Sequence, residues 1–217
     1  MKVVATVILA VVLAAAGWFG WSAYQGAQES NFAAQAVQSS AAQTERQLKA
    51  RKEDGITFAE YFKRGTSTID GLDKAISEID SRTWNHKASD RDVAVAFIEQ
   101  CKAIIRADQT QTRLLMDENT ARKATDLAKK EMDEADSSAS VKWTLKRYQS
   151  ASADFIEVLN KQIESLKEST SKIEKMLAVD ESAKSTFGPS VGLSAEMVGS
   201  MKKSISPPVL EKPASAP

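Results

Sequence analysis

Arg106 and Arg113 are the pair of residues whose type and spacing best suit binding chemistry. They are seven positions apart, so on a helix they share one face, and two guanidinium groups there could hold a small carboxylate bidentately. Asp108 and Gln111 lie between them, where the apolar stripe of the surrounding sequence is interrupted. Such an interruption can be a ligand pocket between helices, a polar layer that fixes the register of a bundle, or a face turned to water.

The other reactive side chains are too few for a catalytic or metal site. His86 is the only histidine and Cys101 the only cysteine, so the sequence offers neither a nucleophile–base pair nor a set of soft metal ligands. A single cysteine also excludes an intrachain disulfide, and Cys101 lies among apolar residues as a small buried side chain would. We predict a protein that is not an enzyme and that uses no metal and no cofactor.

Charge argues against nucleic acid as a partner. The 217 residues carry 29 basic and 29 acidic side chains, which gives no net charge. Binding a polyanion needs lysines and arginines gathered on one face. Here the two signs alternate along the sequence, as they do on solvated helices.

The N-terminal 26 residues predict a membrane anchor. Residues 3–24 are uncharged and mostly apolar, and roughly 20 such residues are needed to span a bilayer. Trp18, Trp21 and Tyr24 lie at the C-terminal end of this run, where aromatic rings favour the headgroup level. We expect residues 1–26 to cross the inner (cytoplasmic) membrane once with the N-terminus inside, so that the bulk of the chain is periplasmic.

A cleaved signal peptide is the alternative explanation of this run. Ala14, Ala15 and Ala16 form a small-residue site after an apolar stretch. Cleavage there would leave an aromatic N-terminus that begins with Gly17 and Trp18. The product would be a secreted or periplasmic helical protein.

Residues 27–180 predict an all-α bundle built from long helices. A turn at Asp54 and Gly55 and another at residues 84–86 separate the first three segments, and Asp136 marks the turn before the last. Thr57 with Glu60, and Ser89 with Asp92, have the spacing of capping boxes. If Gly55 reverses the chain, the result is a four-helix antiparallel bundle. If it does not, a single helix to Arg82 gives an elongated three-helix bundle or coiled coil.

The last predicted helix, residues 141–179, carries the most regular apolar seam of the chain. A run of positions from Leu145 to Met176 alternates steps of three and four, and Ile156 and Ile163 widen it. A stripe wider than a strict coiled-coil seam indicates a bundle of more than two helices. Beyond Asp180 the pattern stops, and the glycines, serines and prolines of residues 181–217 predict a flexible tail.

A second basic and aromatic cluster follows the Asp136 turn. It comprises Lys142, Trp143, Lys146 and Arg147. In the three-helix arrangement the first helix would lead on the order of 80 Å away from the membrane, and the next helix would return most of that distance. The cluster would then lie near the lipid surface, where such side chains favour anionic headgroups. Otherwise Trp143 packs against the core.

These features predict an anchored helical interaction or scaffold protein. Its partners would be membrane lipid, through residues 3–24, and another protein or a second copy of itself, through the heptad faces. The alternative is a sensory bundle that binds a small anion at Arg106 and Arg113.

Overall fold

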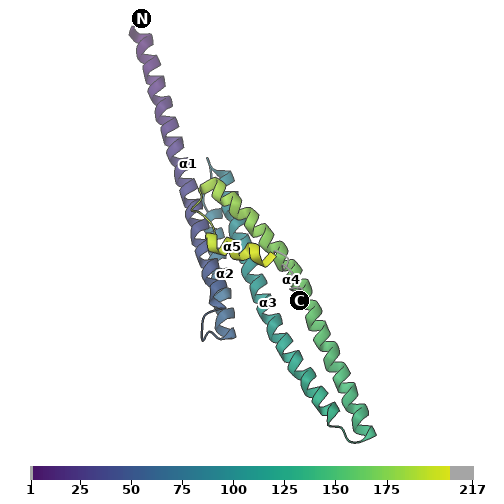
Figure 1. The fold of residues 1–217 in the computed structure, drawn as a ribbon. Helices are drawn as coiled ribbons and strands as arrows, with labels where there is room; N and C mark the ends of the chain where they lie inside the picture. The colour runs from purple at the N-terminus through teal and green to yellow at the C-terminus, as the bar shows by residue number, and fades with distance from the viewer. Residues whose placement is uncertain (1, 206–217) are drawn as a thin grey trace, which may run out of the picture. The chain divides into compact units, whose positions relative to one another are not determined.

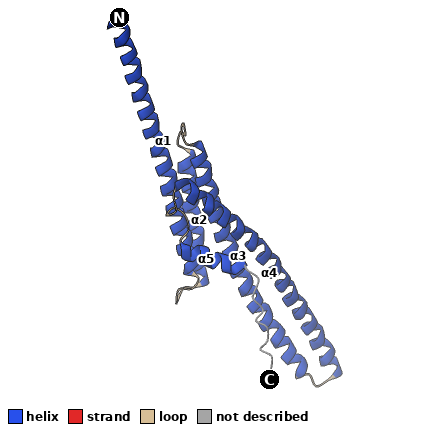
Figure 2. Ribbon diagram, turned by 45° about the horizontal axis from the view of Figure 1, so that its top comes forward, coloured by secondary structure: helices blue, strands red, loops and turns tan. Residues whose placement is uncertain are grey.

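The computed structural model describes the backbone of residues 2–205 and the side chains of residues 18 and 20–205. Within this range the chain forms five α-helices and no strand (Figures 1 and 2). Their bounds are α1 Lys2–Ala50, α2 Phe58–Asp80, α3 Ala88–Asp133, α4 Ser138–Phe187 and α5 Ala195–Ile205. The predicted all-α class and helical bundle are confirmed.

The helices divide into two compact units, each described by itself. Unit 1 comprises Met1–Lys102 and Lys175–Met201, and unit 2 comprises Ala103–Glu174 and Lys202–Pro217. The helices α3 and α4 each contribute one part to either unit.

In unit 1 the chain reverses between α1 and α2. Gly55 adopts a φ of +81°, which the absence of a Cβ permits. The capping box predicted at Thr57 is present: its hydroxyl accepts from the N–H of Glu60 at 3.2 Å, and the Glu60 carboxylate accepts from the N–H of Thr57 at 3.0 Å. A single helix running on to Arg82 is therefore excluded, and with it the three-helix arrangement.

The two helices lie antiparallel in contact (Figure 1). Near the turn, Gln47 donates to the carbonyl of Tyr61 at 3.3 Å. At the far end, the Arg82 guanidinium lies 3.6 Å from the centre of the Phe32 ring. The core of unit 1 consists of fully buried apolar side chains from four helices: Val37, Leu72, Ile79, Phe97, Ile98 and Met176.

The C-terminal part of unit 1 corrects the prediction of a flexible tail from residue 181. Helix α4 continues to Phe187, and α5 follows after a short connector. Leu193, Met197 and Met201 are buried. Met197 and Met201 are four positions apart on one face of α5, and Leu193 lies in the connector just before that helix. These buried side chains hold the short helix against the core although the segment as a whole is polar. Residues 206–217 lie outside the described part of the chain.

Unit 2 contains a helical hairpin made of residues 103–133 of α3 and residues 138–174 of α4. The two helical segments of the hairpin run antiparallel (Figure 1) and are joined through the turn at residues 134–137. Its side chain to main chain bonds include Thr125 Oγ1 to the Ala151 carbonyl at 3.1 Å and Gln162 Nε2 to the Leu114 carbonyl at 3.2 Å. The turn predicted at Asp136 is confirmed.

None of the described helices combines the length and the hydropathy that crossing a membrane requires. The predicted span, residues 3–24, falls mainly on residues 3–17 and 19, whose side chains are outside the described set. The membrane anchor therefore stays a prediction.

Candidate interaction surface

Exposed large apolar side chains gather in two parts of the described chain. In unit 1 they are Trp18, Trp21, Tyr24 and Phe58. In the hairpin of unit 2 they are Leu115, Met116, Leu127, Val141, Trp143, Leu145, Ile156, Ile163 and Leu166. Scattered apolar residues are normal on a protein surface, but a regular exposed row indicates a face that another molecule covers.

Such a row lies along α4, because the helix turns only part of its apolar stripe toward α3. Tyr148 and Phe155 are half-buried, and Gln162 and Ser165 bond to side chains or main chain of α3. Ala151 accepts from Thr125 of α3. Small and polar residues thus make the hydrogen bonds between the two helices of the hairpin, while several large apolar residues of α4 stay exposed.

The exposed row, which we name the outer α4 stripe, comprises Ile156, Leu159, Ile163 and Leu166. The exposed fractions are 57% for Ile156, 52% for Ile163 and 56% for Leu166, and Leu159 is half-buried. The successive steps of three, four and three residues are those of a seam that pairs with another helix. Full burial of side chains of this size contributes roughly 1.5–3 kcal/mol each relative to exposure, so an unpaired stripe leaves a substantial driving force for association.

The four residues around the interrupted stripe of α3, which are Arg106, Asp108, Gln111 and Arg113, have different environments in the structure. Gln111 is half-buried and donates to Ser165 Oγ at 2.8 Å and to Ser169 Oγ at 3.5 Å. Arg106 and Arg113 are exposed, and the main-chain carbonyl of Asp108 accepts from the buried Thr112 hydroxyl at 2.8 Å. This geometry favours a polar layer at Gln111, with the two arginines on the hairpin surface. A carboxylate site on the arginines stays a prediction.

The basic and aromatic cluster at the start of α4 is partly engaged within the hairpin. Arg147 lies with its guanidinium carbon 4.8 Å from the centre of the Trp143 ring and forms an ion pair with Glu131. Lys142, Trp143 and Lys146 are exposed. The argument that placed this cluster at the lipid surface required an unbroken first helix, and that helix ends at Ala50. Lipid contact at the cluster stays a prediction without that support.

The aromatic residues of the predicted membrane belt are exposed on α1. Trp18 and Trp21 have most of their surface accessible, and the Trp21 and Tyr24 rings lie 6.1 Å apart between centres. The Tyr24 hydroxyl accepts from Gln28 Nε2 at 2.6 Å. From Gly26 onward α1 packs against other parts of unit 1, since Gly26 is buried beside His86.

Sequence reasoning missed Glu29 of α1, which binds the main chain of the loop that precedes α3. Its carboxylate accepts the main-chain N–H groups of Asn85, His86 and Lys87 at 3.1, 3.0 and 2.8 Å. Desolvation acts to raise the pKa of Glu29, but these three donors outweigh it and lower the pKa below the ordinary value. The predicted capping box at Ser89 is wrong, because α3 begins at Ala88 and Ser89 lies inside the helix.

The same end of unit 1 has a shallow polar crevice. It is lined by Gln25, Gln28, Glu29, Arg82, Thr83 and Trp84. Its polar groups already have structural partners: Glu29 binds the loop before α3, Arg82 stacks on Phe32, and Trp84 Nε1 donates to the Ile79 carbonyl at 2.9 Å. We therefore interpret the crevice as a result of packing and not as a ligand site.

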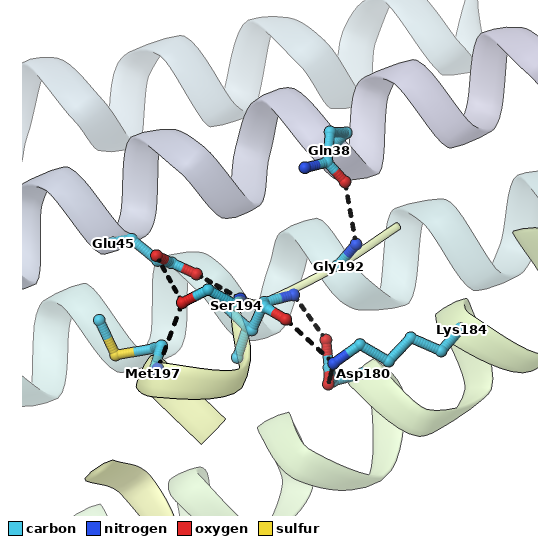
Figure 3. A network of polar contacts seen from close by, with 8 residues as sticks. Gln38, Glu45, Asp180, Lys184, Gly192, Ser194 and Met197 are labelled. Atoms are coloured by element: carbon cyan, nitrogen blue, oxygen red, sulfur yellow. Dashed lines mark hydrogen bonds and ion pairs between the residues drawn. The ribbon is translucent and has the colours of Figure 1, made fainter. Parts of the chain in front are cut away.

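A second network missed by sequence reasoning attaches the connector between α4 and α5 to α1 (Figure 3). The buried Asp180 carboxylate accepts from the N–H of Leu193 at 2.7 Å and from Lys184. Gln38 and Glu45 of α1 accept from the N–H groups of Gly192 at 3.2 Å and Ser194 at 2.6 Å. Every one of these polar groups holds main chain in place, so the network is structural.

Neither the comparison with known proteins nor the distribution of possible metal ligands assigns a function. No protein-family model matches the chain, and no curated protein or solved structure matches it. In the part of the chain that the structure describes, no group of three or more histidine, cysteine, aspartate or glutamate side chains could hold a metal ion. The outer α4 stripe is the feature most suited to a function.

Proposed function

We propose that this protein is a membrane-anchored interaction protein. Its N-terminal residues hold it in the inner membrane, and the hairpin of unit 2 binds another protein chain in the periplasm. The observation that carries the proposal is the outer α4 stripe. Its apolar residues recur at the spacing of a helix-pairing seam, and among the described residues of unit 2 no helix covers that side.

The composition of the chain supports binding without chemistry. Cys101 is buried, and desolvation raises the pKa of its thiol to about 12, so it is suited neither to nucleophilic attack nor to metal ligation. Balanced charge supports protein and lipid partners over nucleic acid.

Site-specific photocrosslinking tests the binding face. A photoreactive phenylalanine derivative replaces Ile156 in the full-length chain in native membranes, and a matched control carries it at Lys161, five positions on and exposed. We expect a discrete adduct at 156 and none at 161. The absence of an adduct at 156, or equal adducts at both positions, overturns the proposal.

The anchor is tested separately on the same membranes. Resistance to extraction at alkaline pH, together with an intact N-terminus in the mature chain, supports a spanning anchor. A mature N-terminus close to Gly17 would instead identify a cleaved signal peptide. Only the anchoring part of the proposal would then fall.

A further inference from the structure

The outer α4 stripe has the residue order of one particular kind of helix pair. Written as heptads, Ile156 and Ile163 occupy a positions, and Leu159 and Leu166 occupy d positions. Among parallel coiled coils, isoleucine at a with leucine at d is the combination that favours two strands. A partner of unrelated sequence would not need this order, whereas a second copy of the same helix supplies it on both sides.

We propose that two copies of this chain pair in parallel and in register through the outer α4 stripe. This deepens the proposed function and rests on it, since it names the partner that the hairpin binds. Each isoleucine and leucine of the stripe then meets its own equivalent in the second copy. A parallel pair also suits two chains that are anchored the same way in one membrane.

The charges of the hairpin permit pairing with itself. Residues 103–174 contain twelve basic and thirteen acidic side chains, so two hairpins do not repel each other strongly. The positions that flank the stripe hold Asn160, Gln162, Lys167 and Ser169, of which only the lysine is charged. A strongly acidic or basic partner would find no matching field on this face.

The size of the stripe indicates a weak pair that depends on the membrane. From Ile156 to Leu166 the stripe is about 15 Å long and about 10 Å wide, which gives on the order of 150 Å² per chain. Stable interfaces bury about 800 Å² per partner. Confinement of both chains to one membrane raises their effective concentration and compensates for the small area.

Cysteine crosslinking of the full-length chain in native membranes tests the proposal. Ile163→Cys and Leu166→Cys place a thiol at an a and a d position, and Lys161→Cys places one on the opposite, exposed side. The natural Cys101 is buried, so the wild-type chain serves as the blank. On mild oxidation we expect at least ten times more disulfide-linked dimer from each stripe variant than from Lys161→Cys.

A charge variant checks that the stripe itself drives the pair. Adding Ile163→Asp to Leu166→Cys places two carboxylates opposite each other and should lower the dimer yield at least tenfold. Lys161→Asp in the same background should leave the yield unchanged. Because residues 161 and 163 are both exposed, the helical content and the melting temperature of all variants should match wild type.

Each other outcome overturns a defined part of the argument. Equal dimer yields at positions 161, 163 and 166 mean random collision. When chains with Ile156→Cys and chains with Leu166→Cys are mixed, a 156–166 disulfide without a 166–166 disulfide means antiparallel pairing. Both overturn the parallel pair. A photoadduct at 156 to a different protein, without disulfide dimer, overturns pairing of two copies and leaves the proposed function standing. If neither a photoadduct nor a disulfide-linked dimer forms, both the pairing of two copies and the proposed function are overturned.

Discussion

Gly192 lies so close to Asp180 that a Cβ atom at position 192 would be 2.4 Å from the Asp180 carboxylate oxygen. Gly192 also adopts a φ of +119°, a conformation that side chains disfavour. The next residue, Leu193, donates its N–H to the same carboxylate at 2.7 Å. Close approach of the main chain to Asp180 is therefore what fixes the connector that carries α5.

Gly192→Ala should destabilise the protein by on the order of 2–3 kcal/mol, through backbone strain and the clash with Asp180. Urea unfolding of the full-length chain in detergent, followed by circular dichroism, measures this. Gly188→Ala is a partial control, because Gly188 has a φ of +106° but open space around its Cβ position, and it should lose less.

Gly199 is a control for which the expected change in stability has the opposite sign. It lies inside α5, and no atom lies within 4 Å of the position that a Cβ atom would take. Gly199→Ala should therefore stabilise the helix by about 0.5–1 kcal/mol. Equal effects of Gly192→Ala and Gly199→Ala would contradict the role assigned to the close approach.

Glu29→Gln should make the stability less sensitive to acid. The pKa of Glu29 is lower in the folded chain than in the unfolded one, so its contribution is present above the unfolded pKa, near 4.5, and is lost as the pH falls through the folded value. At neutral pH the variant should lose about 1 kcal/mol, because a neutral amide oxygen accepts these N–H groups less strongly than a carboxylate does. The difference from wild type should shrink below pH 4.5.

Unfolding free energies measured from pH 7 to pH 3 check the Glu29 prediction. Glu60→Gln is a useful comparison, because Glu60 caps α2 from within its own helix and its pKa is lowered, first by the N–H and then by the hydroxyl of Thr57. Curves for wild type and Glu29→Gln that stay parallel down to pH 3 would show that the carboxylate charge does not contribute.

Local signals carried most of the fold prediction. The breaks at Gly55, at residues 84–86 and at Asp136, and the cap at Thr57, depend on neighbouring residues and are present in the structure. The contacts that hold the loop before α3 were missed because their acceptor, Glu29, lies 56 positions from Asn85 in sequence. No local pattern carries that information, since tertiary contacts decide which acceptor reaches these N–H groups.

The same dependence on tertiary contacts explains why the exposed face of α4 and the helix α5 were not predicted. The apolar stripe of α4 was visible in sequence, but a wide stripe does not say which half meets the neighbouring helix. Small residues such as Ala151 and Ser165 fixed that choice by contacting α3. For α5, the polar side chains that hold its start, Gln38 and Glu45, come from α1.

Cys101 should resist thiol reagents in the folded protein. It is fully buried, and desolvation raises the pKa of its thiol to about 12, so at pH 8 the reactive thiolate is scarce as well as inaccessible. We expect no labelling by a maleimide under native conditions and complete labelling in denaturant. Lys161→Cys, which adds an exposed thiol outside the proposed pair, should react once per chain. Rapid labelling of the wild type would contradict the burial of Cys101.

The polar layer and the anion site make opposite predictions for α3. If Gln111 fixes the hairpin register, Gln111→Ala loses its bond to Ser165 and should cost about 1 kcal/mol. Arg106→Ala, at an exposed position, should stay within about 0.5 kcal/mol of wild type. Thermal unfolding with and without succinate separates the two models, because a ligand that binds only the folded chain must raise the melting temperature. We expect no shift; a rise in wild type that Arg106→Ala abolishes would instead identify the arginine face as a carboxylate site, since a purely structural layer cannot respond to the ligand.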